Sequence, residues 1–293
     1  MPLAESIPPK LAAMTERDEF DAVRSDPDPL RRGRRAAELI TVYQQRAAEL
    51  ARLRRAAIDE AHQTLGLNYT DIAAQLGITK GRVTQIRSSA PPQERAFFGV
   101  GPVSVGIPRR YGVEEGRERP FFDAVDMASQ AAVEDTLSRL ALATTPFAIE
   151  PTTETVPEGD SVLICGPKSA PVARVLLAGD PYLDFEQDGG GRWWIHGKTP
   201  GKSVWLDSPY RRANPERSDV GYFARHVSSG GVTVHIAGIT SVGSLGVIHW
   251  LIQNLRTLFL GNEDDSMCGV VRCDFDEQFA VQSSRLVAGP HTW

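Results

Sequence analysis

Two turns in the second half of the 293-residue chain combine residue types that bind anions. The first, CGPKSAP, covers residues 165–171, and the second, AGITSVGSLG, covers residues 237–246. Each turn follows an apolar run typical of a buried strand and precedes a helical pattern. Helix N-termini at the carboxyl ends of parallel strands offer unpaired N–H groups to anions. A third turn, GIPRRYG at residues 106–112, offers arginines as anion partners. The candidate ligand-binding residues in the three turns are Arg109, Gly166, Lys168, Ser169, Gly238, Thr240, Ser241, Gly243 and Ser244.

These turns indicate a small anionic ligand of nucleotide size. Their glycine spacing matches neither a P-loop nor a complete dinucleotide-binding fingerprint. Glycine and serine also occur between a strand and a helix simply because close packing demands small residues. Ligand binding and packing are therefore two open interpretations of the glycines. At the level of topology, this half of the chain loosely resembles Rossmann-like nucleotide-sensing domains and nucleoside-processing domains of the deoxyribosyltransferase kind.

Catalytic motifs are weak in this sequence. GITSVG is one residue too long for a nucleophile elbow. Cys268 and Cys273 have no second cysteine pair, and the histidines lack metal-ligand spacing, so we expect neither a metal nor a cofactor. If the protein is an enzyme, Glu150 and Asp219 are the candidate catalytic carboxylates, because a carboxylate beside a nucleotide can activate ribosyl transfer or hydrolysis. We expect His235, inside VTVHIAG, to be a core histidine.

A second stretch, TDIAAQLGITKGRVTQIR at residues 70–87, contains two short helical patterns separated by Gly77. Asn68 or Thr70 can cap the first helix, and Thr79 can cap the second. Gly77 can adopt the positive φ of a tight turn. The second helix has a polar outer face suited in size to a major groove. This face consists of Thr79, Lys80, Arg82, Thr84, Gln85 and Arg87.

The segment YTDIAAQLGITKGRVTQIR resembles the helix-turn-helix of sigma-factor region 4. Together with the Arg/Ala/Leu-rich helix before it, it is similar to the small DNA-binding modules of actinobacterial regulators. The resemblance covers residues 30–90, and the other sigma regions are missing. It implies binding to double-stranded DNA, with Arg82 and Gln85 at base edges and Thr79, Lys80 and Arg87 at phosphates. The alternative is that the two helices form a packing element with exposed charges.

The charge distribution is uneven along the chain. The net charge is −5, but residues 29–90 carry 11 Lys and Arg against 5 Asp and Glu. The rest of the chain carries 21 against 32. Salt screens interactions between charges that lie more than about 10 Å apart. A local basic patch can therefore bind phosphates although the whole chain is acidic.

The pattern predicts four segments: a flexible lead at 1–28, a helix-turn-helix domain at 29–90, a linker at 91–96 and an α/β domain at 97–293. One long helix is expected from Leu30 to Leu65, with an apolar stripe that needs a partner. A second copy of the chain, giving a homodimer, and packing within the chain are both possible partners.

We expect an α + α/β fold, in which the helical domain precedes a Rossmann-like α/β sandwich with a mostly parallel sheet. Residues 219–230 are expected to form a short helix. Without a secretory signal or an apolar run of about 20 residues, we expect a cytoplasmic protein without a membrane partner. The three cysteines are expected to be reduced thiols.

These features together predict a DNA-binding transcriptional regulator whose α/β domain senses a small anionic ligand, with a nucleotide as the first candidate. One alternative is a nucleoside- or NAD-processing hydrolase or transferase tethered to a DNA-binding module. Another is a structural partner in a complex, in which the two short helices only mediate association.

Overall fold

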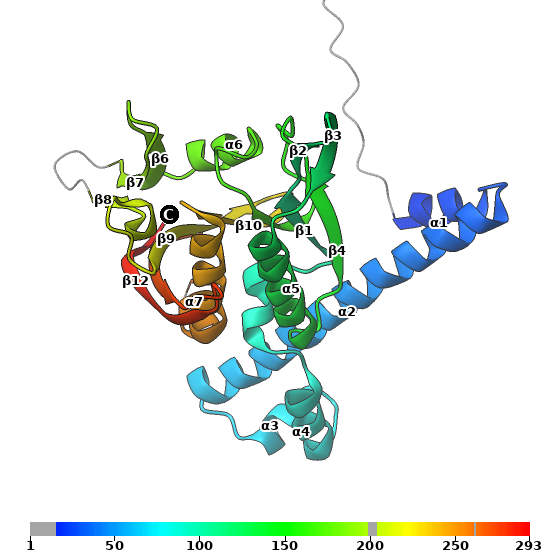
Figure 1. Cartoon of the computed structure of the whole chain (residues 1–293). Helices are drawn as coiled ribbons and strands as arrows, with labels where there is room; N and C mark the ends of the chain where they lie inside the picture. Colours follow the sequence, from blue (N-terminus) through cyan, green and yellow to red (C-terminus); the bar gives the residue numbers. More distant parts are fainter. Residues whose placement is uncertain (1–15, 199–203, 261) are drawn as a thin grey trace, which may run out of the picture. The chain divides into compact units, whose positions relative to one another are not determined.

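The computed structural model describes residues 16–198, 204–260 and 262–293. About two fifths of the chain is helical and just under a third is strand, so the fold is mixed (41% and 30%; Figure 1). The chain divides into two compact units, residues 1–44 and residues 45–293. The division falls inside the long helix and not at residues 91–96, where the sequence predicts a linker.

The first unit begins with helix α1, Glu16–Arg24, within the expected flexible lead. Its Phe20 ring stacks on Tyr43 with the ring centroids 5.5 Å apart. The long helix α2, Pro29–Thr64, starts where the Asp28 carboxylate accepts the backbone N–H of Leu30 at 2.9 Å. The predicted long helix is therefore confirmed. Residues 1–15 of the expected lead lie outside the described residues.

The second unit is built on a seven-stranded sheet within the described residues, in the order β12-β11-β9-β10-β5-β1-β4. Strands β4, β1, β5 and β10 are mutually parallel, whereas β10, β9, β11 and β12 pair antiparallel. The prediction of a mostly parallel sheet is therefore wrong, since half of the pairings are antiparallel. The strands are β1 (Val103–Pro108), β4 (Thr144–Ile149), β5 (Asp160–Ile164), β9 (Ser218–Ser228), β10 (Gly231–Gly238), β11 (Met267–Phe275) and β12 (Val281–Thr292).

The largest error in the sequence prediction concerns β9. Residues 219–230 are expected to be helical, but Ser218–Ser228 forms a central strand that pairs with both β10 and β11. Its residues from Ser218 to Arg225 are buried on both faces, so the sequence lacks the alternation that marks a half-exposed strand. The strand turns directly into β10 and so creates the antiparallel half of the sheet.

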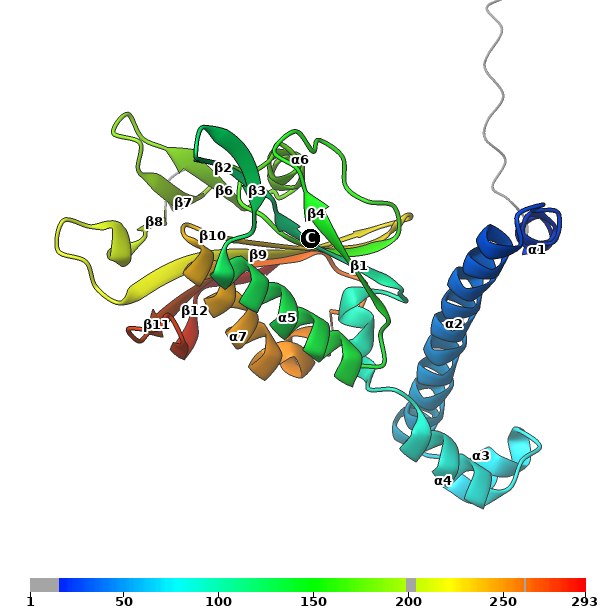
Figure 2. The ribbon, with the colours of Figure 1, turned by 45° about the vertical axis from the view of Figure 1, so that its right-hand side comes forward.

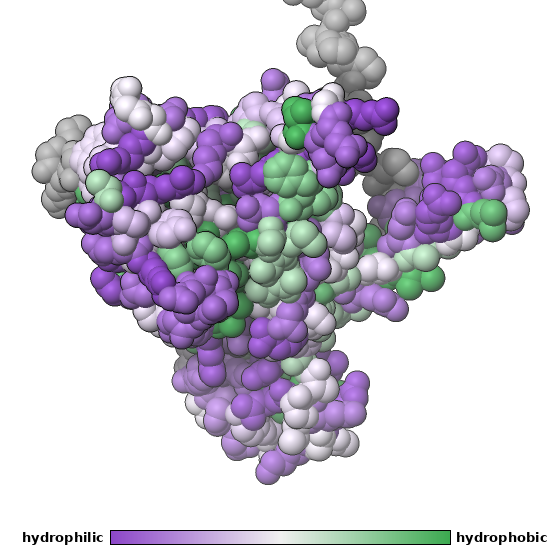
Figure 3. Space-filling model, viewed as in Figure 1, coloured by the Kyte–Doolittle hydropathy of each residue, from purple (hydrophilic) through white to green (hydrophobic). Residues whose placement is uncertain are grey.

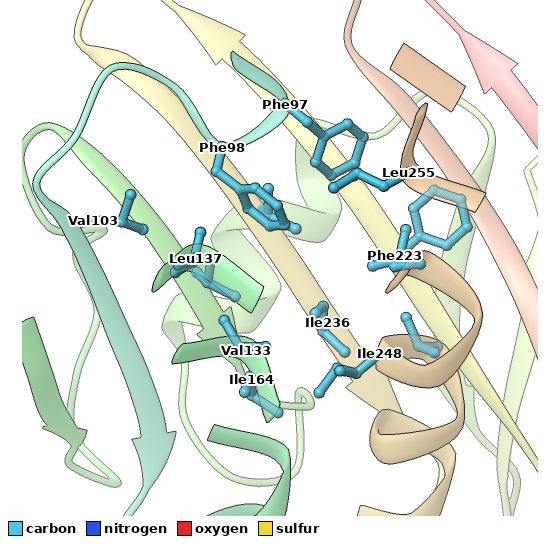
Figure 4. Packing of buried hydrophobic residues seen from close by; sticks show 14 of the residues in the cluster. Phe97, Phe98, Val103, Val133, Leu137, Ile164, Phe223, Ile236, Ile248 and Leu255 are labelled. Carbon is cyan, nitrogen blue, oxygen red and sulfur yellow. The ribbon is translucent and has the colours of Figure 1, made fainter. Parts of the chain in front are cut away.

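Helices cover both faces of this sheet. Helices α5 (Ala124–Arg139) and α7 (Ser241–Phe259) lie side by side on one face (Figure 2). Their side chains pack on alternate strand residues such as Val103 and Ile236 (Figure 4). The intervening residues, such as Leu163, face helix α6 (Val172–Ala178) on the other side.

Two small sheets complete the second unit. The hairpin of β2 (Arg110–Glu114) and β3 (Arg117–Phe121) lies between β1 and α5 in the chain. A three-stranded sheet, β6-β7-β8, packs through Phe185 and Ile195 on the same side as α6. These strands are β6 (Leu183–Gln187), β7 (Trp193–Gly197) and β8 (Trp205–Asp207).

The predicted linker is part of the core. Residues Gln93–Phe98 form the 3₁₀ helix η1, in which Arg95, Phe97 and Phe98 are buried. The Arg95 guanidinium donates to Gln45 Oε1 at 2.8 Å, to the Val100 carbonyl at 2.6 Å and to the carbonyls of Leu140 and Ala141. The linker prediction is therefore wrong for Gln93–Ala96. Pro and polar residues indicated a loop there, but Arg95 finds its acceptors on segments far away in the sequence.

Hydrophobic and hydrophilic residues are unevenly distributed over the surface. In the view of Figure 3, hydrophobic colours gather between α5 and α7, and hydrophilic residues dominate over α3 (Tyr69–Gln75) and α4 (Lys80–Ser89). Among the residues that the structure describes, no helix is both long and apolar enough to cross a bilayer.

Candidate functional site

Helices α3 and α4 form the first candidate site, and both begin at the predicted caps. Asn68 Oδ1 accepts the backbone N–H groups of Thr70 at 2.9 Å and Asp71 at 3.1 Å. Thr79 Oγ1 accepts the N–H of Arg82 at 3.2 Å. Gly77 lies between the helices with φ +65°. The caps satisfy N–H groups that a short helix would otherwise leave unpaired.

A small apolar core fixes the two helices against the C-terminal part of α2. This core consists of the buried side chains of Ile58, Ile72, Ala73, Val83 and Ile86. The residues of α4 that alternate with Val83 and Ile86 on the outer side are left exposed. Packing thus determines which side of α4 faces solvent.

Five of the six predicted DNA-binding residues are exposed together on α4 and its cap, namely Thr79, Lys80, Arg82, Thr84 and Gln85. The Arg82 guanidinium donates to Gln85 Oε1 at 2.7 Å, so the two predicted base-reading side chains orient each other. The Thr84 hydroxyl donates to the Lys80 carbonyl at 3.3 Å.

Arg87, the sixth predicted DNA-binding residue, is paired within the protein. Its Nε lies 2.6 Å from Asp59 Oδ1, and its guanidinium sits 4.5 Å from the centre of the Tyr69 ring. The side chain is half-buried in these contacts. Arg87 therefore joins α4 to α2 and to the start of α3. Its position after the last buried residue of α4 gave no sign of this pairing.

Replacing Gly77 by Ala should lower the free energy of unfolding by about 1 kcal/mol, because an L-residue is strained at this positive φ. The matched control is Gly81→Ala. Gly81 lies inside α4 with open space around it, so there Ala should stabilise the helix by up to about 1 kcal/mol. Urea unfolding of both variants checks the prediction. Equal effects of the two substitutions would contradict it.

The second candidate site lies where the parallel strands end. Arg109 follows β1, Glu150 follows β4, the 165–171 turn follows β5, and the 237–246 turn joins β10 to α7. Because β4, β1, β5 and β10 are parallel neighbours, these segments share one edge of the sheet. The structure thus brings the two predicted turns together.

The N-terminus of α7 already holds a carboxyl group from the protein itself. Asp219, which is fully buried at the start of β9, accepts the N–H groups of Thr240 and Gly243, each at 3.1 Å. It also accepts the Thr240 hydroxyl at 2.5 Å. An internal carboxylate therefore takes the place predicted for a ligand at these two residues. The sequence prediction missed this because it placed Asp219 in a helix.

Burial raises the pKa of the Asp219 carboxyl group, while the nearby hydroxyls of Ser208 and Thr240 act in the opposite direction. Its second oxygen, Oδ1, and Ser208 Oγ make no hydrogen bond among the described residues, although Ser208 is close enough to favour the charged carboxylate. Asp219 is thus a helix cap with one unused acceptor.

Close packing explains the glycines of the second turn. A side chain at Gly238 would overlap the Thr240 carbonyl and the Ser244 backbone, and one at Gly243 would overlap the Val220 carbonyl. The Gly238 N–H donates to Ser244 Oγ at 2.8 Å. Of the two interpretations open from the sequence, packing therefore accounts for Gly238 and Gly243. Ser244 is a partner of the backbone in the same arrangement.

The first turn remains more open. A side chain at Gly166 would meet only the Gly238 carbonyl, at an ordinary contact distance of 3.7 Å. The Ser169 N–H donates to the Gly166 carbonyl at 2.9 Å, and the Lys168 ammonium donates to the Ile239 carbonyl at 2.5 Å. Lys168 therefore links the two turns. Ser241, at the start of α7, is half-buried.

Several charged groups surround the Lys168 ammonium. We call Arg110, Asp126, Lys168, Arg211 and Asp219 the edge cluster. Partial burial of the ammonium lowers the pKa of Lys168, and Arg110 and Arg211 lower it further. Arg110 pairs with the buried Asp126 at 2.7 Å, and burial raises the pKa of Asp126 despite this pairing. Asp126 and Arg211 were missed, because in sequence each looks like an ordinary helix-end or loop charge.

The other predicted residues at this edge are paired. Arg109 lies 2.7 Å from Glu150, which also accepts the Tyr111 hydroxyl at 2.9 Å. Glu150, proposed from sequence as a catalytic carboxylate, therefore forms an ion pair with a neighbouring arginine. Arg109 is only about one third exposed and lies 5.6 Å from the centre of the Phe122 ring.

His235 is a core residue, as the sequence predicts. Its Nε2 lies 2.8 Å from the Cys165 carbonyl, and Nδ1 has no hydrogen-bond partner among the described residues. Burial lowers the pKa of His235 to about 4, so the imidazole is neutral in the folded protein at neutral pH. It donates from Nε2, which fixes the tautomer.

Within the described residues, no group of His, Cys, Asp and Glu is arranged to hold a metal ion. No protein-family model, curated protein or solved structure matches the chain. The arguments about function therefore rest on the two sites themselves.

Proposed function

We propose that this protein is a DNA-binding transcriptional regulator whose α/β domain senses a small anionic ligand. The observation that carries the proposal is the row of exposed polar side chains on α4, set on a capped helix that is fixed by the core around Val83. In this proposal α3 and α4 act as a helix-turn-helix like that of sigma-factor region 4. The basic charge of residues 29–90 supports it.

The proposed contacts follow from the exposed groups. Arg82 and Gln85 are the candidates for base edges, because each can bond two groups of one base in the major groove. Lys80, with Thr79 at the helix N-terminus, is the candidate for phosphates. Arg87 is left out of this set because Asp59 and Tyr69 hold it.

Selection from a random double-stranded DNA library, followed by fluorescence anisotropy, tests the proposal. Affinity should fall linearly with the logarithm of salt concentration. Lys80→Ala should weaken binding to all sequences and reduce the salt slope by about 1, whereas Arg82→Ala should reduce discrimination at one base position by about 1–3 kcal/mol.

The control is Arg139→Ala, which removes an exposed arginine from α5 and should leave DNA binding unchanged. Failure to enrich any sequence, together with weak binding that Lys80→Ala and Arg139→Ala affect equally, would contradict DNA recognition by α4.

For the α/β domain we propose a Rossmann-like ligand site. The parallel strands run in the order β4-β1-β5-β10, so chain connections diverge between β1 and β5. Ligands of open α/β sheets bind at the carboxyl ends of strands at such a point. Arg110 and the Gly166–Ser169 segment follow β1 and β5, and Lys168 and Arg211 supply further positive charge. A nucleotide phosphate fits this chemistry, and no cofactor is proposed.

The second candidate function is a nucleoside- or NAD-processing hydrolase or transferase with a DNA-binding module. Two buried carboxyl groups with raised pKa values, Asp126 and Asp219, favour it, since such groups are frequent in active sites. Incubation of the protein with NAD, nucleotides and nucleosides, followed by mass spectrometry, separates the two functions. A regulator retains a compound unchanged, whereas an enzyme consumes it.

We also propose that the regulator is a homodimer, because DNA readers of this kind commonly bind two half-sites. Leu50 and Leu53 on α2 are exposed, at 66% and 47% of their surface, and offer apolar area for a second copy. The sequence indicates that the apolar stripe of this helix needs a partner, supplied by a second copy or by packing within the chain. Its residue Ile58, by contrast, is buried within the chain against α3 and α4.

A further inference from the structure

A cavity of about 350 Å³ lies on the small sheet β6-β7-β8, a part of the fold that neither proposed site uses. Four described residues line it: Glu186, Asp188, Trp194 and Trp205. Two indole rings and two carboxylates thus surround one space, without a lysine or arginine among the lining residues. This composition differs from that of the edge cluster, where cations predominate.

The two rings stand nearly at right angles. Trp194 and Trp205 have centroids 6.3 Å apart and an interplanar angle of 76°. Trp205 is about half exposed, although a tryptophan on a small sheet would normally be covered. The cavity is therefore bounded by two aromatic side chains of different orientation.

Neighbouring groups hold the walls in place. Trp194 Nε1 donates to Asp188 Oδ2 at 3.2 Å. His196 stacks on Trp205 with centroids 4.7 Å apart and does not line the cavity, so it supports the ring from outside. Backbone N–H groups and Trp194 also lower the pKa of Asp188, so its carboxylate is charged at neutral pH.

We propose that this cavity binds an organic cation of the quaternary ammonium class. A ring face attracts a cation through its quadrupole, and the attraction is strongest for tryptophan. The Glu186 and Asp188 carboxylates add negative charge on the same side. A compact, methylated ammonium can touch two perpendicular rings at once, whereas a planar guanidinium stacks on one. The Arg192 guanidinium carbon already lies over the Trp194 ring, 6.0 Å from its centre.

Calorimetric titration of the full chain with choline, and with its neutral isostere 3,3-dimethyl-1-butanol, tests the site. The two ligands have the same shape, so a difference reports the charge. Choline should bind at least tenfold more tightly, since cation–π and carboxylate terms of about 1.4 kcal/mol suffice for that factor. Equal affinity of the two compounds, or no binding of choline, would overturn the proposal.

Variants locate the binding. Trp205→Leu should weaken choline binding at least tenfold, and Glu186→Gln, which keeps the shape of the wall, should weaken it severalfold. Trp293→Phe is the control, because this tryptophan packs on Tyr182 and His226 outside the cavity, and it should leave the affinity unchanged. Loss of binding in the control equal to that in Trp205→Leu would also overturn the proposal.

The quaternary ammonium could be a free metabolite or part of a peptide. A peptide with trimethyl-lysine and the same peptide with unmodified lysine separate these sources. Tighter binding of the methylated peptide than of choline assigns the ligand to a protein, and the reverse order assigns it to a small molecule. Since the cavity is independent of α4 and the edge cluster, its failure would leave the proposed regulator untouched.

Discussion

Replacing Arg95 by Met should lower the free energy of unfolding by about 3–5 kcal/mol, the range for removing one partner of a buried charged network. Arg95 is fully buried and donates to Gln45 and to the carbonyls of Val100, Leu140 and Ala141. Met fills a similar volume but donates no hydrogen bond, so these acceptors lose their partner in a place closed to water. Urea unfolding measured by circular dichroism gives the change.

The matched control is Arg139→Met, which removes an arginine whose side chain is 60% exposed and pairs with Asp135. Exposed ion pairs contribute little, so the control should change stability by less than about 1 kcal/mol. If Arg95→Met were no more destabilising than this control, the result would contradict the role of the Arg95 hydrogen bonds in stabilising the fold.

Acidification should destabilise the protein by about 3 kcal/mol between pH 6.5 and pH 4 through His235 alone. Burial lowers the pKa of this histidine from 6.5 to about 4 in the folded state. Between these values the unfolded chain takes up a proton that the folded protein excludes, so stability falls as the pH falls. Lowering the pKa of His235 from 6.5 to about 4 corresponds to about 3 kcal/mol of stability. Urea unfolding at several pH values measures it.

His235→Gln should flatten the stability profile in this window. His226 also has a pKa lowered by burial, so part of the decline persists in the His235 variant. Asp126 and Asp219 contribute with the opposite sign, because their raised pKa values penalise folding above pH 3.8. Only the difference between the wild-type and His235→Gln profiles isolates His235. An unchanged profile in that variant would contradict the assignment.

The elements that the sequence predicted well are those specified by local signals. The long helix has an uninterrupted apolar stripe, and α3 and α4 have their caps and Gly77. Each of these signals acts within a few residues of the structure that it determines. Helix caps, turn glycines and helical periodicity can therefore be recognised without knowledge of the tertiary fold.

The errors concern residues whose environment is created by distant segments. β9 is a strand because β10 and β11 pair with it on both sides, and this burial erases the alternation that would have marked it. Arg95 lies in a Pro-containing polar stretch, yet its partners come from α2 and from the end of α5. No local pattern contains that information.

The candidate ligand site shows the same division. The sequence correctly joined a strand end, a small-residue turn and a helix N-terminus at residues 165–171 and 237–246. The sequence did not predict that Asp219 would accept N–H groups at the N-terminus of α7. Asp219 belongs to β9, a strand that was predicted to be a helix. Nor did it predict Arg211, whose charge lowers the pKa of Lys168 in the folded protein.

The buried position of Arg95 also limits how the two proposed sites could communicate. A flexible linker would allow α4 to rotate freely relative to the α/β sheet. Here the connecting segment is the 3₁₀ helix Gln93–Phe98, which contains the buried Arg95. Rotation of this segment requires several hydrogen bonds of the Arg95 guanidinium to break at once. Under the proposed function, a signal between the two sites would therefore be a small displacement passed between packed elements, and it would change the fit of α4 more readily than its direction.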